Sequence, residues 1–327
     1  MMIEDLRTLA LRDWLENDLL LTIDHCTLAS SDASFRRYFR VKTSENTFIV
    51  MDAPPEKEQL APFIRVAGLM SDATLHVPVI FQQNLTDGFL LLEDLGSQCF
   101  SQRLNNDSTD DLYQTACDNL FKLQSKTELL NSGLPPYDQA LLQRELTIFE
   151  EWFLEQTLDV IIPTALWQSV RTLLINSALE QPITCVHRDY HSRNLMVLDD
   201  ESLGVIDFQD AVLGPITYDL VSLLRDCYIA LPVSQVEQYL KSHYQRLQQA
   251  ELIDCDFAQF KRWFDLMGMQ RHLKAIGIFS RLNLRDNKPD YLNDIPRTLN
   301  YVLAQAQAYP EFAEFADFLT TEVLPIL

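Results

Sequence analysis

The chain has 327 residues, 47% of them hydrophobic, and a formal net charge of −21 at pH 7. This length and hydrophobic content are enough for a packed core in two domains or lobes. The negative charge repels nucleic-acid phosphates and anionic membrane surfaces, so we expect no nucleic-acid or membrane partner.

Six cysteines are spread along the chain without a Cys-x-x-Cys pair. This spacing indicates neither a zinc site nor a disulfide framework, so we expect reduced thiols and a cytoplasmic location. The first residues include acids, and no apolar run reaches the about 18 residues that span a bilayer. We therefore expect neither a secretion signal nor a membrane helix.

The first 95 residues predict a small antiparallel sheet crossed by a helix. Apolar residues at helical spacing predict a leading amphipathic helix over residues 3–21, with Trp14 in the core. Two β-rich runs at 37–42 and 48–52 flank a polar turn and predict a hairpin. The further elements expected here are a helix over 56–70 and strands over 77–81 and 89–92.

Beyond residue 95 the pattern is mostly helical. We expect helices over 110–126, 138–158, 163–179 and from 215 to the end. The predicted fold class is α+β with two lobes, a small antiparallel-sheet lobe over 1–95 and a large, mostly helical lobe over 96–327.

The stretch 183–210 carries the most chemical information. Two short apolar runs after Asn194 flank a polar turn and predict a second hairpin, which ends at Asp207. Because antiparallel strands lie about 5 Å apart, we expect Asp189, Asn194 and Asp207 to face one small volume. Carboxylate and amide oxygens suit Mg²⁺ and a phosphate-bearing ligand.

The same stretch matches a catalytic motif. His187-Arg188-Asp189 followed by Asn194 fits the loop H-R-D-x-x-x-x-N, in which the aspartate accepts the proton of the attacking hydroxyl and the asparagine holds a metal. Asp207-Phe208-Gln209 stands where kinases have D-F-G, whose aspartate holds Mg²⁺. Here the chain resembles the kinase-like phosphotransferases. We therefore expect a two-lobed protein-kinase-like fold with a nucleotide in the cleft, in which 1–95 form the nucleotide-binding lobe and 96–327 the helical catalytic and substrate lobe. The alternative is a solvated surface turn rich in carboxylates.

The phosphate-binding side departs from the kinase pattern. Kinases place a lysine on the third strand, paired with a glutamate, but this chain has Met51 there. We expect Arg36 or Arg37 to supply the cation, because arginine matches phosphate oxygens bidentately. The alternative is that both arginines decorate an edge strand. Without a lysine partner, Glu58 is expected to be a solvated helix residue.

Backbone groups are expected to complete the nucleotide site. No glycine lies in the candidate phosphate loop, where the small residues Ser31, Ala33 and Ser34 let the backbone approach the phosphates. The apolar strand that runs into Glu93 and Leu95 is expected to offer backbone groups to adenine. The alternative is that this apolar strand, which ends in acids, has a structural role only.

Several motifs together look like the aminoglycoside phosphotransferase (choline kinase-like) family; they span 186–195, 206–210 and 214–220. Within that family, other stretches are similar to the bacterial sugar kinases that phosphorylate the anomeric hydroxyl of N-acetylmuramate and N-acetylglucosamine in cell-wall recycling; they are 32–40, 50–55 and 270–274. The resemblance implies ATP and Mg²⁺ as cofactors. It also implies that the missing lysine on the third strand is a feature of the family. It implies Asp189 as catalytic base and Asn194 and Asp207 as metal ligands. We also expect a structural role for His187.

The acceptor is expected to be a small molecule. Gly214-Pro215 is predicted to open a helix within a few residues of Asp207, which leaves no room for a peptide-docking segment. Asp219, early in that helix, is expected to accept hydrogen bonds from the catalytic-loop backbone. The alternative is an acid stabilised by the helix N-terminal dipole.

Acceptor recognition is expected from the helical lobe. N-acetylmuramate carries a carboxylate that cationic side chains would meet, whereas aminoglycosides are polycations and would need acids. His191 is expected to line the sugar site, or else to be a structural histidine. The cationic residues are Arg225, Arg271, His272 and Lys274, and a solvated face is the alternative for each.

We therefore predict an ATP- and Mg²⁺-dependent kinase that phosphorylates the anomeric hydroxyl of N-acetylmuramate or N-acetylglucosamine, with Asp189 as base. An aminoglycoside-type antibiotic phosphotransferase shares the chemistry and differs in its acceptor. A non-catalytic nucleotide-binding pseudokinase is the third possibility, motivated by the missing lysine and Gly-rich loop.

Overall fold

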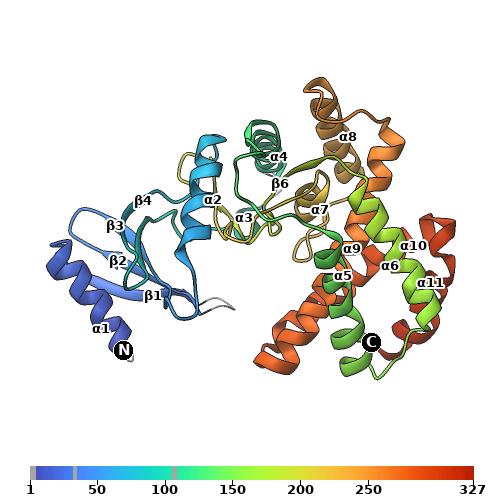
Figure 1. The fold of residues 1–327 in the computed structure, drawn as a ribbon, viewed down its shortest axis with the longest axis horizontal. Coiled ribbons are helices and arrows are strands. Elements are labelled where there is room, and N and C mark those ends of the chain that lie inside the picture. Colours follow the sequence, from blue (N-terminus) through green and yellow to red (C-terminus); the bar gives the residue numbers. More distant parts are fainter. Residues whose placement is uncertain (1–4, 32–34, 105–108) are drawn as a thin grey trace. The chain divides into compact units, whose positions relative to one another are not determined.

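The computed structural model describes residues 5–31, 35–104 and 109–327. These residues form two compact units (Figure 1). The first combines Met1–Cys99 with Leu195–Asp210, and the second combines Phe100–Asn194 with Ala211–Leu327. The hairpin that follows the H-R-D motif therefore groups with the N-terminal residues.

A five-stranded antiparallel sheet in the order β1-β2-β3-β5-β4 forms the body of the first unit. The predicted hairpin is confirmed, since β2 and β3 pair from Arg37 with Asp52 to Lys42 with Thr47. Strand β1 was not predicted, because it lies at the sheet edge and most of its residues are exposed, so it lacks apolar alternation. The strands are β1 His25–Ser31, β2 Arg37–Lys42, β3 Thr47–Asp52, β4 Ile80–Asn84 and β5 Phe89–Glu93.

Helix α1, Leu6–Asp13, covers one side of this sheet. Its N-cap is Asp5, and it continues as a π-helical turn over Trp14–Asp18, so the helix is shorter than expected. Trp14 is buried as predicted, with its ring centre 5.8 Å from that of Phe89 on β5. The other buried members of this core are Leu11, Leu15, Phe39, Val41, Val50 and Leu91.

Helix α2, Leu60–Asp72, packs against the segment that follows the second hairpin. The ring of Phe63 on α2 lies 4.8 Å from the ring of Phe208. The hairpin itself, β7 Leu195–Val197 with β8 Leu203–Val205, is present as predicted. A backbone bridge from His76 to Gly204 joins it to the N-terminal part of the unit.

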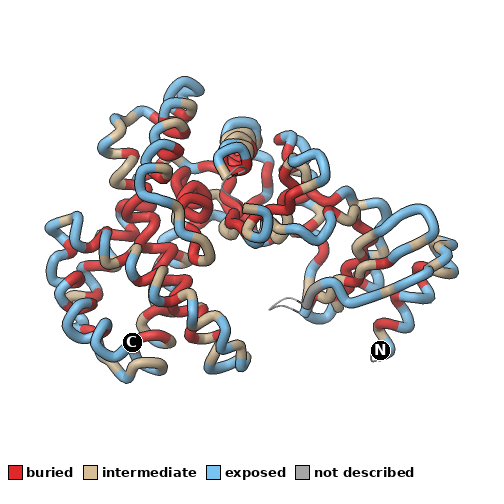
Figure 2. The backbone as a smooth tube through the Cα atoms, turned by 180° about the vertical axis from the view of Figure 1, so that it is seen from behind, coloured by how far each residue is buried: buried red, intermediate tan, exposed pale blue. Residues whose placement is uncertain are grey.

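In the second unit, strand β6, Ile183–Val186, pairs with β9, Val212–Pro215. The prediction that Gly214-Pro215 opens a helix is wrong. Pro215 ends β9, where the missing N–H of proline is tolerated at the end of an edge strand, and helix α7 begins only at Tyr218. Every residue of α7, Tyr218–Leu224, is buried (red in Figure 2).

The predicted helices over 110–126, 138–158 and 163–179 are confirmed. They are α4 Thr109–Lys126, α5 Gln139–Ile148 with a π-helical continuation over Phe149–Thr157, and α6 Thr164–Leu179. The remaining helices of the described part are α3 Phe100–Arg103, α8 Val233–Gln249, α9 Phe257–Asp286, α10 Ile295–Ala308 and α11 Ala313–Phe318.

Helix α9 is the core of the second unit, and it packs against α5, α6, α7 and α10. Gly277 allows α9 to approach the end of α5 closely, because a Cβ atom at this position would lie 2.5 Å from the carbonyl oxygen of Ile148. The middle of α9 is consequently buried on all sides, which a sequence of mixed charged and apolar residues does not suggest.

All six cysteines lie in the described ranges and are free thiols, as expected. Within residues 5–31, 35–104 and 109–327, no helix is long and apolar enough to cross a membrane.

Candidate active site

Asp189 lies in a loop that is folded by its own hydrogen bonds. The backbone N–H of His191 donates to the Asp189 carbonyl at 3.0 Å, and the N–H of Asn194 donates to the His191 carbonyl at 2.9 Å. The side-chain Nδ2 of Asn194 also donates to the Asp189 carbonyl, at 3.0 Å. These bonds bring Asp189 and Asn194 together and orient the amide.

Two further side chains brace the start of this loop. His187 is completely buried, and its Nδ1 accepts the N–H of Asp189 at 3.2 Å. Asp219 accepts the N–H groups of His187 and Arg188 at 2.6 and 3.0 Å, so the hydrogen bonds predicted for it are present. Asp219 also stands in the first turn of α7, where the helix dipole favours an acid. Burial raises the pKa of Asp219 to about 6.

The environment of Asp189 favours its charged form. Burial alone would raise the pKa of this carboxyl, but the positive charges of Lys274, Arg271 and Arg188 outweigh it and hold the pKa well below its usual value. Asp189 is therefore ionised at neutral pH and can accept a hydrogen bond from a hydroxyl.

Two of the predicted acceptor-binding residues are engaged within the protein. Arg225 donates to the Asp265 carboxylate at 2.6 Å, and its guanidinium lies 4.5 Å from the centre of the Phe264 ring. His272 is completely buried, and its Nε2 lies 2.8 Å from the carbonyl oxygen of Arg225. Burial lowers the pKa of His272 to about 3, so its ring is neutral. A solvated face is the wrong description for both.

The other two cations are also buried on α9, but they differ in their partners. Lys274 donates to the Tyr218 hydroxyl at 2.8 Å. Nη1 of Arg271 makes a long contact, 3.6 Å, with the sulfur of Cys227. In the part of the chain that the structure describes, its Nε has no hydrogen-bond partner and no carboxylate pairs with it.

His191 is also buried, and its ring packs edge-on against Tyr228 with 5.1 Å between ring centres. Its Nδ1 has no hydrogen-bond partner among the described residues. Burial lowers the pKa of His191 to about 4, so the ring is neutral at pH 7. Its assignment to the sugar site stays a prediction.

Asp207 belongs to the first unit and follows β8. Its φ is 64°, and its carboxylate accepts a hydrogen bond from the Gln209 amide at 2.8 Å. Asp189 and Asn194 belong to the second unit, so the convergence of the three oxygen-bearing side chains stays a prediction. Within the described ranges, no cluster of three or more His, Cys, Asp or Glu side chains is placed to hold a metal.

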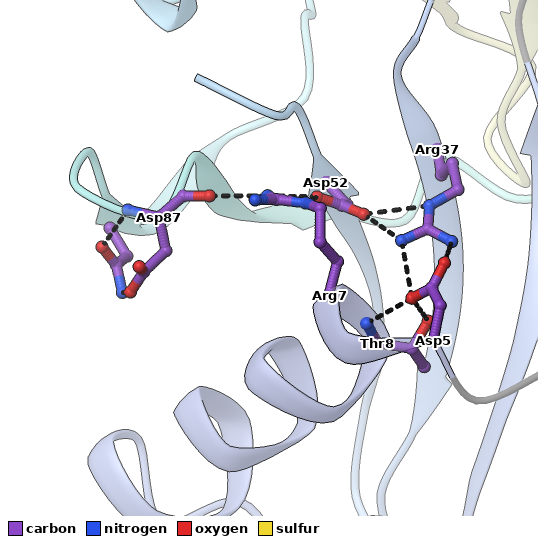
Figure 3. Close-up of polar contacts among 7 residues, drawn as sticks. Asp5, Arg7, Thr8, Arg37, Asp52 and Asp87 are labelled. Carbon is purple, nitrogen blue, oxygen red and sulfur yellow. Dashed lines mark hydrogen bonds and ion pairs between the residues drawn. The ribbon is translucent and has the colours of Figure 1, made fainter. Parts of the chain in front are cut away.

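In the first unit, Arg37 binds two carboxylates (Figure 3). Its guanidinium donates to Asp52 at 2.9 and 2.6 Å and also pairs with Asp5, the N-cap of α1. Asp52 is fully buried and binds Arg7 of α1 as well. This cluster ties α1 to the sheet. Strand β2 has neighbours on both sides, so the edge-strand alternative is wrong for Arg37.

Arg36 has a different partner. Its guanidinium lies 3.0 Å from the carboxylate of Glu58, and both side chains are mostly buried. Glu58 also accepts the backbone N–H of Phe35 at 3.1 Å. The expectation that Glu58 is a solvated helix residue is therefore wrong, because it precedes α2 and forms an ion pair.

The remaining predicted nucleotide contacts are placed as follows. Ser31 ends β1, and Ala33 and Ser34 lie outside the described residues. Glu93 ends β5, and its carboxylate lies 3.0 Å from Nε2 of His76. Leu95 is buried against Gly204 of β8, where a Cβ atom would meet it at 2.7 Å. Their roles toward ATP stay predictions.

Residues 25–253 match the phosphotransferase enzyme family, which is more than two thirds of the chain. The chain belongs to this family. The expectation of an ATP-dependent phosphotransferase is therefore confirmed.

Two curated relatives of this phosphotransferase are similar over most of their length. The N-acetylmuramate/N-acetylglucosamine kinase of Pseudomonas putida is 44% identical over 329 residues, covering 96% of each chain. The protein of the same name from Pseudomonas aeruginosa is 45% identical over 297 residues, covering 90% of this chain and 87% of the relative.

Solved structures match the phosphotransferase in fold. A choline kinase from Streptococcus pneumoniae has a TM-score of 0.65 at 14% identity, with 90% of this chain and 98% of that chain covered. An ADP-bound aminoglycoside phosphotransferase has a TM-score of 0.60 at 13% identity, with 89% and 97% covered. The predicted two-lobed, kinase-like α+β fold is confirmed.

Two buried acids beside the H-R-D loop of the phosphotransferase were not predicted from the sequence. Asp226 accepts the backbone N–H groups of Ser192 and Tyr228 at 2.9 and 2.8 Å. Glu145 of α5 accepts a hydrogen bond from Arg188 at 2.6 Å. Neither acid stands in a motif, and no local pattern distinguishes them from the many solvated acids of this chain.

Proposed function

We propose that this phosphotransferase transfers the γ-phosphoryl group of ATP to the anomeric hydroxyl of N-acetylmuramate and N-acetylglucosamine. The names of the two Pseudomonas relatives support this acceptor class. The observation that carries the proposal is the tightly hydrogen-bonded H-R-D loop around Asp189, together with the buried guanidinium of Arg271, which carries no ion pair within the described residues.

Asp189 acts as the base in the proposed mechanism. Its carboxylate accepts a hydrogen bond from the sugar hydroxyl and points the oxygen at the γ-phosphorus. The hydroxyl proton passes to the carboxylate as the new P–O bond forms, and ADP leaves. Because phosphoryl transfer has a loose transition state, the low pKa of Asp189 is compatible with this role, and positioning supplies most of the rate.

Asn194 and Asp207 are the proposed Mg²⁺ ligands. An amide oxygen and a carboxylate are the hard donors that this ion prefers. Nδ2 of Asn194 is committed to the Asp189 carbonyl, so the amide oxygen is the atom we assign to the ion. When bound, Mg²⁺ neutralises charge on the phosphates.

Arg271 is the proposed partner of the N-acetylmuramate carboxylate. A guanidinium matches a carboxylate with two parallel hydrogen bonds, and burial strengthens them. N-acetylglucosamine lacks this carboxylate, so it would use the same site without that contact. Arg225, His272 and Lys274 are less suited, because each already binds a group of the protein.

The test is an ADP-release assay that offers N-acetylmuramate, N-acetylglucosamine and kanamycin side by side. We expect Mg²⁺-dependent turnover with the two amino sugars. Phosphorylation at the anomeric oxygen blocks the reducing end, so the products should lose reducing-sugar reactivity. Turnover with kanamycin alone would favour an antibiotic phosphotransferase, and a chain that binds ATP without any turnover would be a non-catalytic module.

Arg36 and Arg37 should differ in their effects on ATP use. Arg37 is held by two carboxylates of its own unit, whereas Arg36 forms an ion pair with Glu58, as the kinase lysine does with its glutamate. We expect Arg36→Ala to raise the KM for ATP about tenfold or more, as loss of a charge-assisted bond does. Arg37→Ala should instead lower the Tm and change the KM little. Equal KM values for wild type and Arg36→Ala would contradict this assignment.

The activity of the enzyme should fall in mild acid because of Asp219. Burial raises the pKa of Asp219 to about 6, so below that pH the carboxyl gains a proton and holds the loop N–H groups less well. Between 3.8 and about 6 only the folded state binds this proton, so the group stabilises the fold more as the pH falls. Loss of kcat in this range is therefore not unfolding driven by Asp219.

The measurement is kcat against pH for the wild type and for Asp219→Asn, with Tm recorded at each pH. Asparagine keeps one acceptor oxygen and does not titrate. We expect a lower kcat in the variant, without the acid limb near pH 6 that the pKa of Asp219 predicts. An unchanged acid limb in Asp219→Asn would assign it to another group.

A further inference from the structure

Arg188, which directly precedes Asp189, has a strained backbone. Its φ is 78°, in the left-handed region that side chains with a Cβ atom avoid. Such a conformation persists only where the surrounding structure holds it. The dihedral angles of Arg188 set the direction in which the next side chain leaves the loop. The aim of Asp189 therefore depends on whatever holds Arg188.

Two carboxylates hold Arg188, one at its backbone and one at its side chain. Asp219 accepts its N–H at 3.0 Å, and Glu145 accepts a hydrogen bond from Nη2 at 2.6 Å. Side-chain exposure is 21% for the arginine and 4% for the glutamate. A charge-assisted bond of this length, shielded from most water, is stronger than a surface ion pair.

Glu145 also lies near a second cation, Lys274, whose positive charge lowers the pKa of Asp189. The Tyr137 hydroxyl donates to its carboxylate, and Nζ of Lys274 lies 3.8 Å from it. Lys274 in turn donates to the hydroxyl of Tyr218, the residue before Asp219. One buried carboxylate on α5 thus connects the catalytic loop with α9 and, through Lys274, with α7.

We propose that Glu145 is a positioning residue, which holds Arg188 in its left-handed conformation and so aims Asp189 at the acceptor hydroxyl. This inference rests on the proposed function of Asp189. A misplacement of about 1 Å costs roughly 10²-fold in rate, so the effect belongs in kcat. An ion pair that only stabilised the fold would change Tm and leave the kcat of the folded enzyme unchanged.

The deciding comparison is Arg188→Ala with Arg188→Gly. Both variants lose the bond to Glu145 and leave its carboxylate without the arginine. Glycine adopts φ of 78° without strain, whereas alanine keeps the Cβ penalty. We expect Arg188→Ala to lower kcat about 10²-fold and to leave the KM values for ATP and for the sugar within about threefold of wild type. Arg188→Gly should recover about tenfold of the loss in kcat. Equal kcat values for the two variants would overturn the proposal.

Glu145→Gln tests the other partner. Glutamine keeps the shape and an acceptor oxygen but loses the charge, so we expect kcat to fall roughly tenfold as a charge-assisted bond becomes a neutral one. If Glu145 acts through Arg188, the same change should cost less than about twofold in the Arg188→Ala background. Full additivity of the two changes would also overturn the proposal.

Arg262→Ala is the matched control, because it removes another arginine–glutamate ion pair of 2.6 Å, between Arg262 and Glu311. Its kcat should equal that of the wild type. All variants are compared at a temperature where each is folded by circular dichroism. If Asp189→Ala keeps the wild-type rate, the proposed function itself fails. If Asp189→Ala is inactive and the Arg188 variants are not slowed, only the positioning role fails.

Discussion

Asp189→Ala should lower kcat by at least about 10³-fold, because the variant loses the group that orients the sugar hydroxyl and accepts its proton. The affinity for ATP should change little, since the nucleotide is expected to bind mainly through other residues. Asp189→Asn should be nearly as slow, because an amide keeps the shape but accepts no proton. The measurement is ADP release at saturating sugar, with ATP affinity from calorimetry.

A matched control for this experiment is Asp200→Ala in the exposed turn between β7 and β8. The Asp200 carboxylate accepts hydrogen bonds from the backbone N–H and the hydroxyl of Ser202 in the same turn, so its loss should leave kcat unchanged. An Asp189→Ala protein that turned over at the wild-type rate would remove the catalytic assignment. A variant that lost ATP affinity together with activity would indicate that Asp189 serves nucleotide binding instead.

Arg271→Met should change the choice of acceptor. We expect kcat/KM for N-acetylmuramate to fall roughly 10²-fold, because the substrate carboxylate would be buried without its partner. N-acetylglucosamine carries no carboxylate, so its kcat/KM should fall less than about fivefold. This small fall is expected because the variant also removes a positive charge that lowers the pKa of Asp189. The quantity to measure is the ratio of the two kcat/KM values.

The ratio separates carboxylate recognition from a general effect on the catalytic loop, because a disturbed Asp189 slows both sugars alike. Arg225→Met serves as the comparison. Its guanidinium is held by Asp265, so its loss should alter both sugars in the same proportion. If the ratio stayed at the wild-type value in Arg271→Met, the acceptor carboxylate would have to be bound elsewhere.

Much of the fold follows from local sequence patterns. The β-rich and apolar runs on either side of 43–47 and of 199–202 determine two hairpins, and helical periodicity determines α4 and α6 within one residue at each end. The catalytic motif was recognised for the same reason, since the residues that form the loop around Asp189 lie within eight positions of one another. Elements whose structure depends on residues close in sequence can be predicted from local sequence patterns.

Tertiary structure alone decided the features that depend on distant partners. Strand β9 forms because β6 lies beside it, although Gly214-Pro215 by itself favours the start of a helix. Arg36 and Arg37 are neighbours in sequence, but they pair with different acids. Arg36 pairs with Glu58, whereas Arg37 pairs with Asp52 and Asp5.

Glu145 lies 43 positions from Arg188, too far for any local pattern to connect them. The sequence by itself determined which residues carry the proposed chemistry, because they are local to one loop and one hairpin. Which charges surround Asp189, and which backbone conformation aims it, was decided by packing, because burial and ion pairing depend on segments that meet only in the folded chain.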